Sequence, residues 1–310
     1  MPNFSRFRIL LILLLALPAT GCLFHSHKVE RQVSTAPLKN ATQQDLIAAI
    51  NEQASKIHAL QATVDIDTSV GGSERGKITD YKQIRGYVLL RKPAMLRMIG
   101  LLPIVRNKAF DMVSDGKKFE LWIPPKNKFV VGNNDVVATN PQQPMENIRP
   151  KAIYDALLVH NIDPNDIAIL ENGFETVLDS KRHRVEQPDY ELDVIERGEN
   201  GWYLARKIVF SRTDLLPRRQ LLYNQKSELV TEATYDNYKD QAGITFPNSI
   251  EIYRPLEEYD ITLTMVKLQL NESLADDQFV LQQPPGAEVV HLDRAQAPNQ
   301  RGGSAAPNTK

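Results

Sequence analysis

Hydrophobic residues recur with two different periods in this chain, and the change of period separates a helix from the strands that follow it. Between Leu46 and Ile57, apolar residues return at helical spacing after the capping pattern Thr42–Asp45, which predicts an amphipathic helix over about 43–58. From Leu60 to Val70, apolar and polar residues alternate, as is typical of a strand with one buried face. The folded part is therefore expected to begin with a helix and a strand.

Closely spaced strands dominate the rest of the pattern. They are predicted at Ile78–Arg91, Met95–Leu101, Lys108–Ser114, Lys117–Ile123, Phe129–Val131, 173–179, 189–196, 202–211, 218–224, 227–238, 248–254 and 259–270, with Phe279–Val290 closing the domain. Between the two groups of strands, Pro150 suits the first turn of a second helix. Because successive strands are only a few residues apart, they are expected to pair as an antiparallel meander. The predicted fold class is mainly β with α: one strongly curved antiparallel sheet, an incomplete β-barrel, covered by two or three helices.

The N-terminal pattern is of another kind. Two arginines precede the unbroken apolar run Ile9–Leu17, which is shorter than the roughly 20 residues of a membrane-spanning helix and is typical of a signal peptide. Small residues and then Cys22 follow, and Thr20-Gly21-Cys22 resembles the lipobox of bacterial lipoproteins, although Ala19 departs from the usual leucine. The resemblance implies cleavage before Cys22 and its acylation with fatty acids such as palmitate. The alternative is an ordinary signal peptide followed by an unpaired thiol.

These patterns divide the chain into four parts. They are a signal peptide at 1–21, a flexible tether at 22–41, a single folded domain at 42–293 and a disordered tail at 294–310. Two acyl chains on Cys22 anchor a protein stably to a membrane. Leu23 stands where aspartate would signal retention in the inner membrane, so the expected location is the periplasmic face of the outer membrane.

Composition and charge exclude several classes of protein. The 310 residues are 42% hydrophobic and carry a net charge of −1, which excludes a disordered polymer and argues against a nucleic-acid-binding protein. A single cysteine excludes an internal disulfide framework and any CxxC metal or redox site.

Catalytic motifs are absent from the sequence. It contains no Gly-x-Ser-x-Gly, His-Glu-x-x-His or phosphate-binding loop. Asp65 and Asp67 alternate with apolar residues, which favours the solvated face of a strand over a catalytic pair, and His160 and His183 have no partner visible in the sequence. His25 and His27, without a third ligand, are interpreted as solvated tether residues. The chain is therefore predicted to be no enzyme and to hold no cofactor or metal.

Three stretches resemble the family of LolA and LolB, the periplasmic lipoprotein carrier and the outer-membrane lipoprotein receptor. They are the strand–proline–strand segment Gly86–Arg97, the hairpin Phe110–Val131, and the run from Gly243-Ile244-Thr245-Phe246-Pro247 to Val289. The resemblance implies an apolar cavity for acyl chains under a helical lid. The chain is longer than a typical carrier, with the excess around 133–200, and the arginine that fastens the carrier's lid has no assignable counterpart.

The resemblance also assigns candidate site residues. Cavity-lining candidates are Val88, Leu90, Leu96, Met98, Phe119, Leu121 and Ile123, and lid candidates are Ile153, Tyr154, Leu157 and Leu158. Each of these residues is equally compatible with an ordinary core. The apolar loop of the receptor corresponds to Leu101, Leu102, Pro103, Ile104 and Val105. Five apolar residues at a turn are unlike a solvated hairpin tip, so this loop either touches a membrane or tucks into the core.

Two functions remain open. The first is an outer-membrane lipoprotein that binds acyl chains of lipoproteins or lipids and assists their transfer or insertion. Its partners are those acyl chains, the membrane through Cys22, and a periplasmic carrier protein. The alternative is a non-catalytic structural or sensory lipoprotein of the envelope that uses the same fold to bind a protein partner.

Overall fold

The computed structural model describes residues 33–72, 76–135, 148–178 and 181–292, which fall into two compact units. The larger unit runs from Ala36 to Glu175 and resumes at Pro188; the smaller one combines Thr176–Gln187 with the residues up to Thr35. Within the smaller unit, the Ser34 N–H donates to the Glu186 carbonyl at 2.8 Å. The predicted signal peptide, Cys22 and the predicted tail lie outside the described residues.

Helix α2 (Gln43–Lys56) confirms the predicted first helix and its cap. The Thr42 side chain accepts from the Asp45 N–H at 3.2 Å, and the Asp45 carboxylate accepts from the Thr42 N–H at 2.8 Å. This reciprocal capping box satisfies N–H groups that have no partner inside the helix. Leu46, Ile50 and Ala54 form the buried face that the periodicity predicts.

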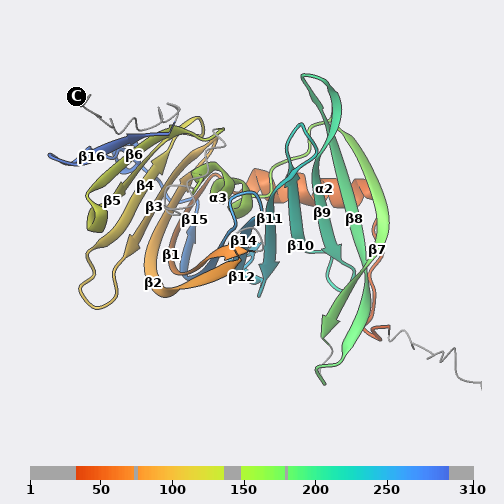
Figure 1. Ribbon diagram of the computed structural model, residues 1–310. Coiled ribbons are helices and arrows are strands. Elements are labelled where there is room, and N and C mark those ends of the chain that lie inside the picture. The colour runs from red at the N-terminus through yellow and green to blue at the C-terminus, as the bar shows by residue number, and fades with distance from the viewer. Residues whose placement is uncertain (1–32, 73–75, 136–147, 179–180, 293–310) are drawn as a thin grey trace, which may run out of the picture. The chain divides into compact units, whose positions relative to one another are not determined.

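Among the described residues, fourteen strands form one large curved sheet that does not close into a barrel (Figure 1). In spatial order they are β16 (Glu288–His291), β6 (Lys128–Asn133), β5 (Lys118–Ile123), β4 (Lys108–Ser114), β3 (Met95–Leu101), β2 (Lys77–Arg91), β1 (Ala59–Gly72), β15 (Tyr259–Leu270), β14 (Ser249–Arg254), β11 (Leu229–Asp236), β10 (Pro217–Tyr223), β9 (Gly201–Ser211), β8 (Arg184–Gly198) and β7 (Ile167–Leu178). The mainly β fold with a curved antiparallel sheet is thus confirmed, and β3 and β4 have the predicted bounds.

Three pairings go beyond a simple meander. Strand β1 pairs with β15, which joins the beginning and the end of the folded chain. Strand β16 pairs with β6 in parallel, since the chain after β15 crosses back to the opposite edge. The predicted strand 227–238 ends at Asp236, and a separate hairpin of β12 (Lys239–Gln241) and β13 (Ile244–Phe246) follows. Turn signals predict neighbours along the chain but carry no information about pairing between distant segments.

The helices pack on separate parts of the sheet. Helix α3 (Pro150–Leu157) joins the main core with residues of β1 to β6, β14 and β15, whereas Leu46 and Ile50 of α2 pack with β8 and β9. Short 3-10 helices, η2 (Pro124–Lys126) and η4 (Asp276–Phe279), complete the described part. Within that part, neither α2 nor α3 has the length and apolar character needed to cross a membrane.

Candidate functional site

A cavity of about 230 Å³ lies beside α2 in the larger unit. Its walls come from α2, the end of α3, the β9–β10 turn, β11 and the segment around β13. It is lined by Ala49, Ile50, Glu52, Gln53, Ala54, Lys56, Ile57, Lys92, Leu157, Leu158, Val159, Phe210, Leu215, Leu216, Pro217, Tyr235, Tyr238, Thr245, Phe246 and Pro247. Fifteen of these twenty residues are apolar or aromatic, so the cavity suits a hydrophobic guest.

The size of the cavity limits what it holds. An apolar cavity of about 150 Å³ is known to admit benzene, whereas sites for drug-sized ligands occupy about 300–1,000 Å³. At about 230 Å³, this cavity fits a short hydrocarbon segment rather than a complete lipid.

Polar contacts fix the cavity walls. The Lys92 ammonium donates to the carbonyl of Ala54 in the last turn of α2, and burial lowers the pKa of Lys92 below its usual value. A cation is favourable at this end of a helix because the carbonyl groups there carry partial negative charge. Gln53 donates to the Thr245 carbonyl at 2.7 Å, and the Tyr238 hydroxyl donates to the Pro217 carbonyl at 2.6 Å. These bonds tie α2 and the surrounding turns into one frame.

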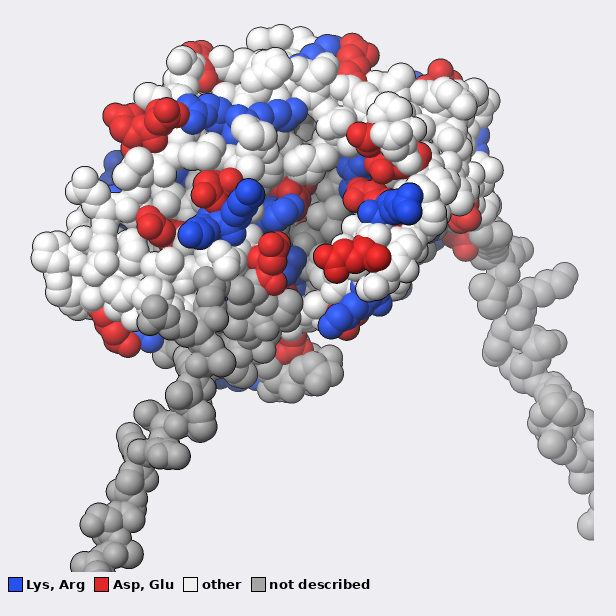
Figure 2. Space-filling view, turned by 90° about the horizontal axis from the view of Figure 1, so that it is seen from above, with Lys and Arg blue, Asp and Glu red and all other residues white. Residues whose placement is uncertain are grey.

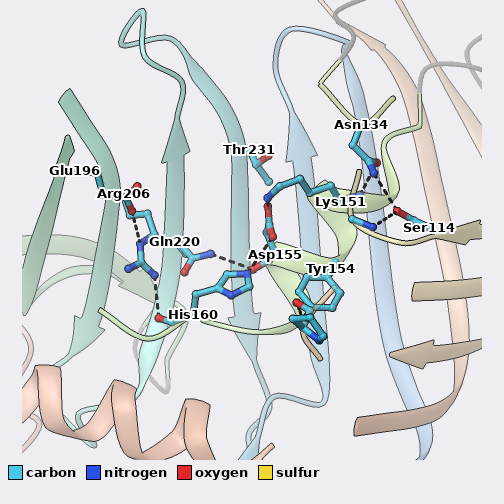
Figure 3. Close-up of polar contacts among 12 residues, drawn as sticks. Ser114, Asn134, Lys151, Tyr154, Asp155, His160, Glu196, Arg206, Gln220 and Thr231 are labelled. Atoms are coloured by element: carbon cyan, nitrogen blue, oxygen red, sulfur yellow. Dashed lines mark hydrogen bonds and ion pairs between the residues drawn. The ribbon is translucent and has the colours of Figure 1, made fainter. Parts of the chain in front are cut away.

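A polar network lies next to the end of α3 (Figure 3). Asp155 is in contact with the Lys151 ammonium at 2.5 Å and with His160 Nε2 at 3.0 Å, and the His160 ring stacks on Tyr154 at 5.7 Å between centroids. Burial raises the pKa of Asp155, but the His160 hydrogen bond and the Lys151 charge outweigh this effect, so the pKa lies below its usual value. The Asp155 side chain is therefore held as a carboxylate.

The same network holds the segment after α3 in place. The Arg206 guanidinium donates to the carbonyls of His160 and Asn161 at 2.9 and 3.1 Å. Asn51 of α2 accepts from the Ile162 N–H at 2.8 Å and donates to its carbonyl at 3.2 Å. Leu157 and Leu158 form part of the cavity wall and come just before residues 160–162 in the chain. The hydrogen bonds to residues 160–162 therefore also hold these two leucines in position.

A histidine–carboxylate pair alone does not make a catalytic site. Two hydroxyl groups drawn in Figure 3 accept hydrogen bonds from other residues: Thr231 accepts from Arg254 at 2.7 Å, and Ser114 accepts from Asn134 at 3.0 Å. The arrangement has the features of a structural clamp. The sequence shows no obvious partner for His160, and the five-residue spacing from Asp155 is the one signal that points to this contact.

The seven predicted cavity-lining residues lie in the main core. Val88, Leu90, Leu96, Met98, Phe119, Leu121 and Ile123 are all at most 3% exposed and pack with α3. The cavity beside α2 has other walls, so a lipid-binding role for these seven residues stays a prediction.

The predicted lid residues are all buried on α3 and at its end, and they serve two purposes. Leu157 and Leu158 line the cavity, whereas Ile153 and Tyr154 pack into the main core. The Tyr154 hydroxyl donates to the Pro93 carbonyl at 2.6 Å. Burial, assisted by the negative charge of Asp155, raises the pKa of Tyr154 to about 12.

The predicted apolar loop projects from the end of the β3–β4 hairpin. Leu101 and Leu102 are half-buried, but Ile104 is 99% exposed and Val105 is 63% exposed. The alternative that this loop tucks into the core is therefore wrong for its tip. Ile104 also has a φ of 69°, a conformation that a β-branched residue rarely adopts.

The two aspartates of β1 that the sequence singles out contact polar side chains of β2. Asp65 pairs with Arg85 at 2.6 Å and Asp67 accepts from Gln83 at 2.8 Å, which agrees with the predicted polar strand face. Figure 2 shows basic and acidic side chains interspersed on one face of the molecule.

Comparison with known proteins finds similarity in structure. No protein-family profile and no curated protein sequence matches the chain. Similar solved structures include a LolA superfamily protein from Nitrosomonas europaea, with 14% identity, a TM-score of 0.45, and coverage of 76% of this chain and 97% of the other. A DUF1329 family protein from Desulfovibrio piger has 15% identity, a TM-score of 0.49, and coverage of 76% and 95%. A putative outer membrane lipoprotein-sorting protein domain from Vibrio parahaemolyticus has 11% identity, a TM-score of 0.41, and coverage of 75% and 94%.

Proposed function

We propose that this chain is a non-catalytic lipoprotein of the outer membrane that binds an acyl chain of a lipoprotein or lipid and assists its transfer. The observation that carries the proposal is the predominantly apolar cavity between α2, the end of α3 and the β9–β10 turn. An acyl segment that enters it is removed from water, which contributes about 25 cal/mol for each Å² of apolar surface buried. Transfer on this basis is passive, because the segment leaves one apolar environment for another.

The exposed loop supports contact with the receiving membrane. Ile104 and Val105 present apolar side chains to solvent at the tip of a hairpin, where polar turn residues are usual. In water this exposure is unfavourable, whereas insertion at a membrane surface buries both side chains. An acylated Cys22 would anchor the chain to a membrane, and the predicted tether at 22–41 would let the loop reach that membrane.

The cavity is tested by filling it. Ala54 lines the cavity from α2 and is 6% exposed, so Ala54→Leu adds three carbon atoms to the space that the acyl segment needs. Ala48→Leu makes the same change on the exposed side of the same helix and is the matched control. Residues 22–310 with Cys22→Ser, which cannot be acylated, are titrated with a fluorescent fatty acid.

The proposal is supported if the parent protein and Ala48→Leu bind the fluorescent fatty acid with similar affinity. Ala54→Leu should bind it at least about tenfold more weakly. Absence of uptake by the parent protein would refute the proposal, and so would equal affinity of the two leucine variants. Far-ultraviolet circular dichroism establishes that the variants are folded.

A further inference from the structure

Strand β7 stands at the end of the sheet (Figure 1), and no strand among the described residues pairs with its second edge. The outer edge of such a strand carries N–H and C=O groups with which another extended chain can pair. Ala168 and Leu170 pack toward the core, so the alternate positions point to the opposite face of the sheet. On that face Ile167 and Ile169 are 44% and 43% exposed.

Carboxylates concentrate on the same face next to these isoleucines. The five are Glu171, Glu175, Asp189, Glu191 and Asp193, from β7 and β8. Lys207 is in contact with both Glu191 and Asp193, the latter at 3.5 Å. One ammonium group thus pairs with two carboxylates, and the cluster of five carboxylates retains an excess of negative charge.

Gly173 makes room for two of these carboxylates. A Cβ atom at this position would lie 2.4 Å from Asp189 Oδ1 and 2.5 Å from Glu191 Oε1. The two side chains of β8 therefore extend over the backbone of β7 at its only glycine. A glycine inside a strand often marks a place where another group approaches the backbone closely.

Asp189 lacks a counterpart for one of its oxygen atoms. The residue is 4% exposed, and its Oδ1 has no hydrogen-bond partner among the described residues. Burial, together with the negative charges of Glu191 and Glu175, raises the pKa of Asp189 to about 6, although Arg219 opposes this shift. A buried carboxylate without a partner is costly, and a cation brought to it would be bound favourably.

We propose that the outer edge of β7 binds an extended segment of a partner protein that carries Lys or Arg side chains at alternate positions. Its backbone pairs with β7, as in other cases of strand addition to a sheet edge. The side chains between these cations point to the other face of the sheet, on the side of Ala168 and Leu170. Its cationic side chains contact Glu171 and Glu175 and reach across Gly173 to Asp189, since neighbouring strands are only about 4.8 Å apart.

The required cation is better supplied by a side chain than by a metal ion. No group of three or more histidine, cysteine, aspartate or glutamate residues within the described ranges has an arrangement that could hold a metal. Ammonium and guanidinium groups on long side chains can instead contact the carboxylates one at a time, and Arg and Lys often do so at protein interfaces.

The test uses residues 22–310 with Cys22→Ser and a fluorescent eight-residue peptide of alternating valine and lysine. Binding is measured by fluorescence anisotropy, and amide hydrogen exchange locates the contact. We expect slower exchange over residues 167–175 and binding about tenfold weaker in the variant Glu171→Gln/Glu175→Gln, because two charge pairs are lost. The matched control, Asp80→Asn/Glu272→Gln, removes two exposed carboxylates elsewhere and should bind like the parent protein.

Two further comparisons separate strand pairing from general charge attraction. A peptide with four lysines followed by four valines has the same charge but cannot alternate, so it should bind at least about tenfold more weakly. Gly173→Ala should also weaken binding, since the added methyl group displaces Asp189 and Glu191. Equal binding of the two peptides would overturn the proposal, as would slower exchange only outside 167–175 or unchanged affinity in Glu171→Gln/Glu175→Gln.

Discussion

Arg97 of β3 and Asp111 of β4 form a two-bond ion pair on the sheet face opposite α3. Arg97 Nε and Nη2 donate to the two Asp111 oxygens at 3.0 and 2.8 Å, and the Asp111 side chain is completely buried. Lys108 adds a third contact at 2.7 Å. Arg97 Nη1 also donates to the Gln278 carbonyl at 2.9 Å, so the ion pair attaches η4 to the sheet.

Removing the buried charge should therefore destabilise the fold. Asp111→Asn leaves Arg97 beside a neutral amide, and breaking such a buried pair costs about 3 kcal/mol in the free energy of unfolding. Asp80→Asn, at an exposed position of β2, is the control and should change stability by less than about 0.5 kcal/mol. Urea unfolding measures both variants, and equal stability would show that the buried pair contributes nothing.

A polar substitution at Ile104, the tip of the apolar loop, should raise the stability of the protein and weaken its binding to membranes. Ile104 has a φ of 69°, which asparagine adopts much more readily than isoleucine. Ile104→Asn should raise the free energy of unfolding by about 1 kcal/mol and weaken binding to phospholipid vesicles. Val105→Asn should weaken vesicle binding without this gain, since Val105 has no positive φ. Unchanged vesicle binding in both variants would exclude a membrane role for the loop.

The local elements were predictable because their signals are local. Strands β3 and β4 are bounded by turn residues, Pro93 before β3 and Asp115-Gly116 after β4, and Thr42 and Asp45 form the capping box that their spacing indicates. The predicted strand 173–179 misses the first six residues of β7, which begins at Ile167. The reason is that Ile167-Ala168-Ile169-Leu170 are consecutive apolar residues without polar residues between them. Apolar residues at consecutive positions hide the period of two that identifies a strand.

The cavity depends on long-range contacts and was not predictable. It brings Ala54 together with Phe210 and Tyr235, which belong to strands far away in the sequence. Val88 and Leu121 are apolar strand residues, and the sequence does not distinguish residues of a packed core from residues that line a cavity. In the structure both lie in the packed core. Burial follows from the pattern, whereas the position of an empty space depends on how distant elements meet.

Arg206 should control the order of the segment after α3. Arg206→Met keeps the length of the side chain but leaves the His160 and Asn161 carbonyls without their donor. We expect a loss of about 2 kcal/mol in stability and faster amide exchange over 160–162. Fatty-acid affinity should also fall, because Leu157 and Leu158 lose their fixed position. Arg197→Met, at an exposed position of β8, is the control, and faster exchange in that variant as well would contradict a specific clamp.

The pairing of β14 with β15 predicts how stability depends on pH. Asp260 lies on β15 beside Glu251 of β14. Burial, the Glu251 charge and a hydrogen bond to Glu251 raise the pKa of Asp260 from 3.8 to about 7. The folded protein therefore holds a proton at Asp260 between about pH 4 and 7, where the unfolded chain has released it. By linkage, the free energy of unfolding should fall as the pH rises through this range.

Asp260→Asn isolates this effect. The amide donates a hydrogen bond to Glu251 as the protonated carboxyl does, but it cannot ionise. We expect the variant and the parent protein to be similarly stable near pH 4 and the variant to be more stable at pH 8, by a difference that grows between these values. Asp189, whose pKa is raised to about 6, contributes a fall of the same sign to both proteins and cancels in the comparison. Urea unfolding from pH 4 to 8 measures the difference, with Asp80→Asn as the control. A difference that stays constant over this range would show that Asp260 releases its proton at the same pH in the folded and unfolded chains.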